Sequence, residues 1–92
     1  KYDKKATLDL EEIYIIISED KKSAADTFIN KIDQYISLLE INPEMGKDCK
    51  QSGFNRECRV LIYGNYTILY KINKTHISIK RIINTKQNYK GK

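Results

Sequence analysis

The sequence has few of the residues on which most enzyme active sites depend. Its 92 residues include no tryptophan, one histidine, one proline and four isolated glycines. With a single imidazole, His76, a nucleophilic triad lacks its usual base, and scattered glycines exclude a phosphate-cradling loop. No apolar run reaches the roughly 18 residues that span a bilayer, and no signal peptide is visible. Because the chain opens on Lys1, we expect its natural N-terminus to be missing.

Cysteine is also scarce. Cys49 and Cys58 are the only two, nine positions apart. Together with one histidine they are too few for a zinc site, so we expect neither a metal nor another cofactor. The pair could form a disulfide. Without an export signal, however, we expect two reduced thiols in a cytoplasmic protein.

Charge is present in abundance but is unevenly distributed. Residues 1–20 hold three lysines against six acids, a net −3, whereas residues 45–92 hold eleven lysines and arginines against two acids, a net +9. A basic C-terminal half is typical of a surface for an anionic partner, either nucleic acid or an acidic protein segment. Solubility alone would also explain the lysines.

Two amphipathic helices are predicted in the first half of the chain. Apolar residues recur at spacings of three and four over residues 3–18, with Asp3 as the N-cap. A second helix fits residues 23–40, capped by Ser23 and ended by INPEMG (41–46), because Pro43 cannot continue a helix. The short polar connection between them predicts an antiparallel hairpin.

Alternating side chains predict three strands after a polar loop at 47–55. The strands cover about 57–63, 66–73 and 77–84, and Gly64-Asn65 turns the chain between the first two. Tyr66 and Tyr70 alternate with isoleucines, so we expect both to lie under the helices. The whole chain, residues 1–92, is therefore predicted to be one α+β domain, an N-terminal helical hairpin packed on an antiparallel sheet.

The opposite face of this sheet is predicted to be open. In the last strand, alternation places Arg81 on a face with isoleucines, and Lys80 and Ile82 on the other face. Lys80 and Ile82, together with Leu69 and Lys71, make a mixed basic and apolar surface that no predicted element covers.

The candidates for function are basic and tyrosine side chains of the C-terminal half. Lysine and arginine neutralise phosphates, and an exposed tyrosine stacks on a base. A ribonuclease without metal or histidine would use the same types, with Lys or Arg stabilising the charged transition state and Lys or Tyr moving protons. The set comprises Lys47, Lys50, Arg56, Arg59, Lys71, Lys80, Arg81, Lys86, Tyr89 and Lys90.

Four short motifs follow one another along the chain: A..DLEEIY (6–14), L.INPEMG (39–46), Arg59 seven residues before Tyr66 of NYTILY, and RI at 81–82. With the order of elements, they resemble the RelE/ParE superfamily of bacterial toxins over residues 4–88. The resemblance implies a toxin of a type II toxin–antitoxin module that a cognate antitoxin protein holds inactive. One branch, RelE-like, cleaves mRNA on the ribosome, and the other, ParE-like, is associated with inhibition of DNA gyrase.

The pattern favours the ParE-like branch. RelE-like enzymes usually carry an arginine where this chain has Ile62, and an arginine or histidine where it has Asn84. We therefore expect a growth inhibitor that acts on gyrase. One alternative is an mRNA endonuclease with Lys86 and Tyr89 as catalytic residues, and another is a non-toxic nucleic-acid-binding module.

Residue roles follow from the basic set and the resemblance. We expect Arg81 to be a structural, hydrogen-bonded arginine because it shares a face with isoleucines. Target binding is expected at the remaining basic residues of the strands and of the segment before them, namely Arg56, Arg59, Lys71 and Lys80.

One family element is largely absent. Members normally begin with a short strand before the first helix, and here only Lys1 and Tyr2 stand where it would end. Its loss would leave an open sheet edge. We expect an acidic antitoxin segment to bind at this edge or across the open face, and the chain alone to self-associate.

Overall fold

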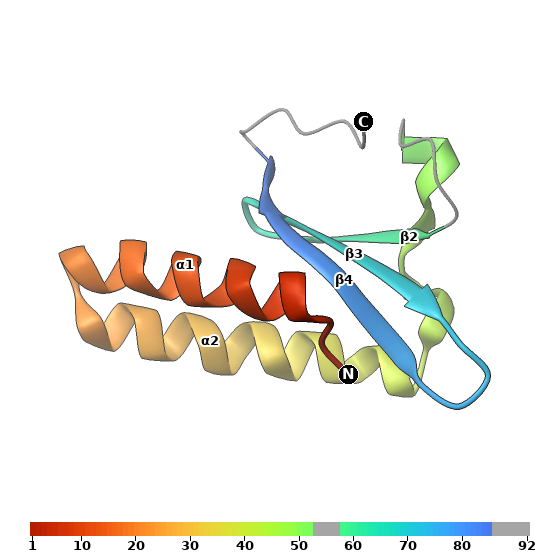
Figure 1. Cartoon of the computed structure of the whole chain (residues 1–92), viewed down its shortest axis with the longest axis horizontal. Helices are drawn as coiled ribbons and strands as arrows, with labels where there is room; N and C mark the ends of the chain where they lie inside the picture. The colour runs from red at the N-terminus through yellow and green to blue at the C-terminus, as the bar shows by residue number, and fades with distance from the viewer. Residues whose placement is uncertain (53–57, 86–92) are drawn as a thin grey trace.

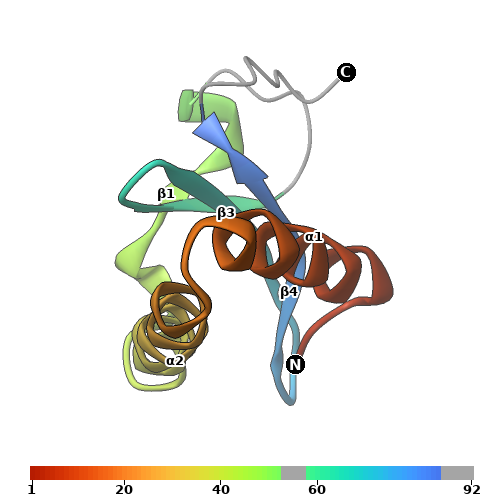
Figure 2. The same cartoon turned by 90° about the vertical axis from the view of Figure 1, so that its left-hand side faces the viewer.

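The computed structural model describes residues 1–52 and 58–85 of the chain. Two helices pack on one face of a four-stranded antiparallel sheet, which confirms the predicted α+β class (Figure 1 and Figure 2). The helices are α1 (Lys4–Asp20) and α2 (Lys22–Ser37), and the 3-10 turns are η1 (Leu38–Glu40), η2 (Pro43–Met45) and η3 (Cys49–Ser52). The strands are β1 (Lys47–Asp48), β2 (Arg59–Tyr63), β3 (Tyr66–Ile72) and β4 (Ile77–Asn84). Within these residues, no helix is long and apolar enough to cross a bilayer.

The helical hairpin forms where the apolar periodicity predicts it. α1 buries Ala6 and Ile13, and α2 buries Ala25, Ile32 and Ile36. Figure 2 shows both helices on the same side of the sheet, with α1 beside β4. Each fully buried isoleucine stabilises the fold by about 1.5–3 kcal/mol. Packing of the apolar stripes therefore fixes the hairpin.

One predicted N-cap is confirmed in position only, and the other is wrong. Asp3 does precede α1, but its side chain makes no capping hydrogen bond in the described structure; its Oδ2 lies 3.0 Å from Lys80 Nζ instead. α2 begins one residue before Ser23, and Lys21, with an extended backbone, makes the turn between the helices. The Asp3 carboxylate therefore pairs with Lys80 on β4 and does not cap α1.

The sheet follows the prediction closely but contains one additional strand. Its order is β1-β2-β3-β4, antiparallel throughout, and β2, β3 and β4 match the three predicted strands to within one or two residues at each end. Gly64 turns the chain with a positive φ of 57°, which glycine adopts at little cost. β1 lies in the predicted loop and pairs with β2 at Val60 and Arg59 only.

The main core lies between the helices and the sheet. Tyr70 is fully buried there with Ile68, and Tyr66 is half-buried against Phe28 with ring centroids 5.1 Å apart. The prediction that both tyrosines lie under the helices is confirmed.

β4 departs from simple alternation at Lys80. Leu69 pairs with Arg81 and Tyr70 pairs with Ile79, so Lys80 has no residue opposite it and forms a β-bulge. Ile79 and Ile82 consequently both pack into the main core. The prediction that placed Ile82 on the opposite face is wrong, because one inserted residue inverts the alternation beyond it.

Part of the opposite face of the sheet is covered, contrary to prediction. Val60 and Leu69 are buried there with Cys49, and Cys58 packs against them. Cys49 and Cys58 form a disulfide with Cα atoms 5.2 Å apart, so the expectation of two reduced thiols is also wrong. The segment read as a polar loop thus covers a second, smaller core.

Part of the sheet edge at β4 is occupied as well. The backbone of residues 1–3 runs parallel to β4: Ile79 N donates to Lys1 O at 2.8 Å, and Asp3 N donates to Ile79 O at 2.9 Å. These residues form an isolated bridge at Tyr2 and not a strand. The predicted row of unpaired groups is therefore wrong at residues 77–79, where the chain supplies partners of its own.

Candidate functional site

The predicted site residues do not form one cluster. Arg56, Lys86 and Tyr89 lie outside the described residues. Arg59 and Lys71 line one shallow groove, while Lys80 lies on the bulge of β4 beside Asp3.

The groove with Arg59 and Lys71 is basic. It has a volume of about 380 Å³ and lies where β2 and β3 meet the disulfide. Among the described residues its lining comprises Asp48, Lys50, Cys58, Arg59, Lys71 and Ile72. We call it the basic groove. Three cations against one carboxylate give it a local excess of positive charge, which favours anionic ligands.

Arg59 is held rigidly in the wall of the basic groove. Its Nη2 donates to the carbonyl oxygen of Gly46 at 2.7 Å and, more weakly, to that of Glu44 at 3.4 Å. Its Nε is buried and has no hydrogen-bond partner among the described residues. The guanidinium is thus used for hydrogen bonds to the segment before β1. Lys50 and Lys71 are the exposed cations of the basic groove.

The same segment is fixed from the other side by Tyr70. The Tyr70 hydroxyl donates to the carbonyl oxygen of Pro43 at 2.7 Å and accepts from Gly46 N at 2.9 Å. A Cβ on residue 46 would lie 2.5 Å from the Val60 carbonyl oxygen and 2.8 Å from the Tyr70 hydroxyl oxygen, so only glycine fits. The physical reason for the PEMG motif is therefore close packing against β2 and β3. Alternation predicted the buried ring of Tyr70 but not this use of its hydroxyl.

Lys80 and Arg81 make ion pairs with the start of α1. Asp9 accepts from Arg81 Nε at 2.7 Å and from Arg81 Nη2 at 3.0 Å, a bidentate pair, and also from Ile82 N at 3.0 Å. Lys80 pairs with Asp3, and both of those side chains are about 40% exposed. Arg81 thus has the hydrogen-bonded geometry expected of a structural arginine, and the charge of Lys80 is shared with a neighbour.

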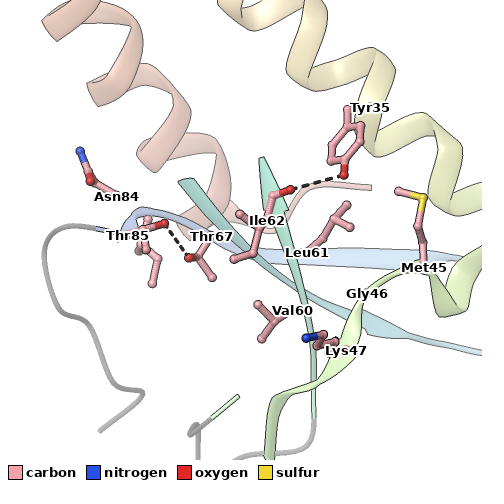
Figure 3. A pocket seen from close by; sticks show the side chains of 11 residues that line it. Tyr35, Met45, Gly46, Lys47, Val60, Leu61, Ile62, Thr67, Asn84 and Thr85 are labelled. Atoms are coloured by element: carbon pink, nitrogen blue, oxygen red, sulfur yellow. Dashed lines mark hydrogen bonds between the residues drawn. The ribbon is translucent and has the colours of Figure 1, made fainter. Parts of the chain in front are cut away.

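A second groove follows the free part of β2 and continues onto the sheet face opposite the helices (Figure 3). It has a volume of about 430 Å³. Tyr35 donates its hydroxyl to Ile62 O at 3.4 Å on one side, and Thr67 and Thr85 join their hydroxyls at 3.0 Å on the other. Its remaining side chains are mostly apolar, and Lys47 and Tyr35 are its titratable groups. We call it the sheet groove.

Neither groove offers a metal site. Across residues 1–52 and 58–85, no three His, Cys, Asp or Glu side chains gather closely enough to hold a metal ion.

A helical hairpin packed on an antiparallel sheet of consecutive strands is the arrangement expected of the RelE/ParE-like class of toxins. The family model for the ParE toxin of the type II toxin–antitoxin system parDE matches residues 1–89, so the chain belongs to the ParE toxin family. Membership assigns it the toxin role and implies an antitoxin partner. No curated protein matched the sequence.

Proposed function

We propose that this toxin stops growth by binding DNA gyrase and that it does not cleave RNA. The observation that carries the proposal is the lining of the sheet groove. Ile62 stands where RelE-like enzymes usually place an arginine, and its side chain is 52% exposed. Thr67 and Thr85 supply hydroxyls rather than a base.

RNA cleavage needs groups that both remove and deliver a proton close to the scissile phosphate. Among the described residues that line the sheet groove, the hydroxyl of Tyr35 is directed to a backbone carbonyl, which leaves Lys47 as the other titratable group. Membership in the ParE family supports gyrase as the target. A cytoplasmic location follows from that target and is part of the proposal.

The basic groove is the surface that we propose for target and antitoxin alike. Lys50 and Lys71 are exposed there, and Arg59 fixes one side of the groove through its hydrogen bond to Gly46. An antitoxin rich in Asp and Glu would neutralise the toxin by occupying these cations first, with fast and salt-sensitive association. Arg56 would extend the binding surface. Lys80 would extend it as well, although its charge is partly neutralised by Asp3.

Pulse-labelling after induction tests the target. We expect DNA synthesis to fall before protein synthesis, and the purified toxin to block supercoiling of relaxed plasmid by gyrase. Early loss of translation with cleaved mRNA, and supercoiling unaffected, would move the protein to the RNA-cleaving branch. Lys71→Glu should weaken gyrase inhibition, while Lys22→Glu on α2, whose lysine is also exposed, should not.

A further inference from the structure

The two halves of the disulfide differ in accessibility. Cys49 is fully buried over Val60 and Leu69, whereas Cys58 is partly exposed and lines the basic groove. Cys49 N also donates to the carbonyl oxygen of Cys58 at 2.8 Å, so the two residues are held side by side by backbone as well as sulfur. A molecule in the groove therefore meets Cys58 and not Cys49.

The charge around Cys58 favours a particular class of reagent. Lys50, Arg59 and Lys71 line the same groove, against the single carboxylate of Asp48. Thiols attack disulfides as thiolate anions, and a positive local potential raises the concentration of anions near the bond. The same cations would stabilise the Cys58 thiolate that a second exchange releases.

We propose that the Cys49–Cys58 disulfide is a thiol–disulfide exchange site for small anionic thiols that enter through the basic groove. A thiolate attacks the Cys58 sulfur and forms a mixed disulfide there, while Cys49 leaves as a thiolate and takes up a proton. A second thiol then attacks the mixed disulfide. The small thiol departs as its own disulfide and Cys58 is left reduced, so two electrons pass from two small thiols to the protein.

Exchange at this bond would release the cover of the smaller core. β1 pairs with β2 at only two positions, and the disulfide is the covalent link that holds η3 in place. Without the link, the segment that carries Lys47 and Lys50 would open more often and expose Val60 and Leu69. The proposal concerns this surface and does not depend on gyrase being the target.

The test follows the rate at which the oxidised full chain loses its disulfide, measured by alkylation and mass spectrometry. Reduced glutathione, an anionic thiol, is compared with cysteamine, a cationic one. Each rate is expressed per thiolate and divided by the rate of the same thiol with a small neutral disulfide. We expect the normalised ratio of glutathione to cysteamine to be about 10 or more at low salt, in the range that electrostatic focusing gives. It should approach one at about 1 M salt, where the screening length is about 3 Å.

Variants locate the effect in the basic groove. Lys50→Gln and Lys71→Gln should each lower the ratio severalfold, and Lys22→Gln, on α2, should leave it unchanged. Trypsin should cut at Lys47 and Lys50 faster after reduction, and a Cys49→Ser/Cys58→Ser variant should be cut fast with or without reductant. A ratio near one in the unaltered chain, a ratio unaffected by either groove variant, or two free thiols in the chain purified in air would overturn the proposal.

Discussion

Gly46 and Arg59 are joined by a hydrogen bond of 2.7 Å from the guanidinium to the glycine carbonyl oxygen. Gly46 also donates its N–H to the buried hydroxyl of Tyr70. One residue without a side chain thus connects the end of the helical hairpin to β2 and β3. Arg59 also lines the basic groove, so its hydrogen bond to Gly46 helps to fix the shape of that groove.

Gly46→Ala should destabilise the protein by about 2 kcal/mol, since an added Cβ overlaps the Val60 carbonyl oxygen and the Tyr70 hydroxyl. Urea unfolding measures the effect. Gly64→Asn is the matched control, because that position is open and asparagine tolerates a positive φ. Equal stability of the two variants would show that the segment before β1 yields easily.

Tyr70→Phe should cost about 1–3 kcal/mol, because it leaves the buried N–H of Gly46 without its acceptor. Truncation of Tyr70 to alanine should cost about 3 kcal/mol or more through the cavity left in the main core. Tyr66→Phe retains the ring contact with Phe28 and is expected to be nearly neutral. Thermal melting of the three variants decides; a neutral Tyr70→Phe contradicts the structural role of the hydroxyl.

Two ion pairs near the start of α1 should differ in their contribution to stability. Asp9→Ala should cost about 3 kcal/mol, because it removes the bidentate carboxylate from the partly buried Arg81 and the acceptor from the N–H of Ile82. Asp3→Ala should cost less than about 1 kcal/mol, because its pair with Lys80 is well exposed. A double-mutant cycle of Asp9 with Arg81 should show coupling, and additive losses there would argue against a bidentate pair.

The Tyr2 hydroxyl should make stability depend on alkaline pH. Burial, and then the hydrogen bond and charge of Asp33, raise the pKa of Tyr2 above its ordinary value near 10. The folded state therefore holds this proton more tightly than the unfolded chain. The resulting stability is fully present below about pH 10 and is lost as the pH rises through the folded-state pKa.

Unfolding of the unaltered chain and of Tyr2→Phe, compared from about pH 7 to pH 11.5, tests this linkage. The difference in unfolding free energy should be constant up to about pH 9 and should shift against the unaltered chain at higher pH. The other six tyrosines are common to both proteins and cancel. A difference that is constant over the whole range would remove Tyr2 as the source.

Periodicity predicted most of the fold because most of it is periodic. The helix stripes and the alternation in β3 identified the hairpin, the sheet and the burial of Tyr66 and Tyr70. The bulge at Lys80 was not predicted, because the sequence does not show which residue of a strand lacks a partner. β1 was not predicted because a strand of two residues is too short to show alternation.

The candidate site was predicted only in part. Charge alone identified Arg59 and Lys71, which do share a groove. It could not show that the Arg59 guanidinium is turned toward a glycine carbonyl, or that Lys80 has a carboxylate beside it. The expectation of reduced thiols rests on the absence of an export signal, whereas the proximity of Cys49 and Cys58 depends on how β1 folds back on β2.

The asymmetry between the two sides of the sheet limits how this toxin could aggregate. Fibres that grow by strand pairing need each molecule to offer two free edges, one to receive and one to donate. Here the backbone of residues 1–3 blocks β4 at Ile79, and the Asp9 carboxylate accepts from Ile82 N. On the other side of the sheet, β1 pairs with only two residues of β2, so β2 beyond Val60 lies clear of another strand among the described residues. Strand pairing should therefore begin on the β2 side, and misassociation by this route should favour closed pairs over fibrils.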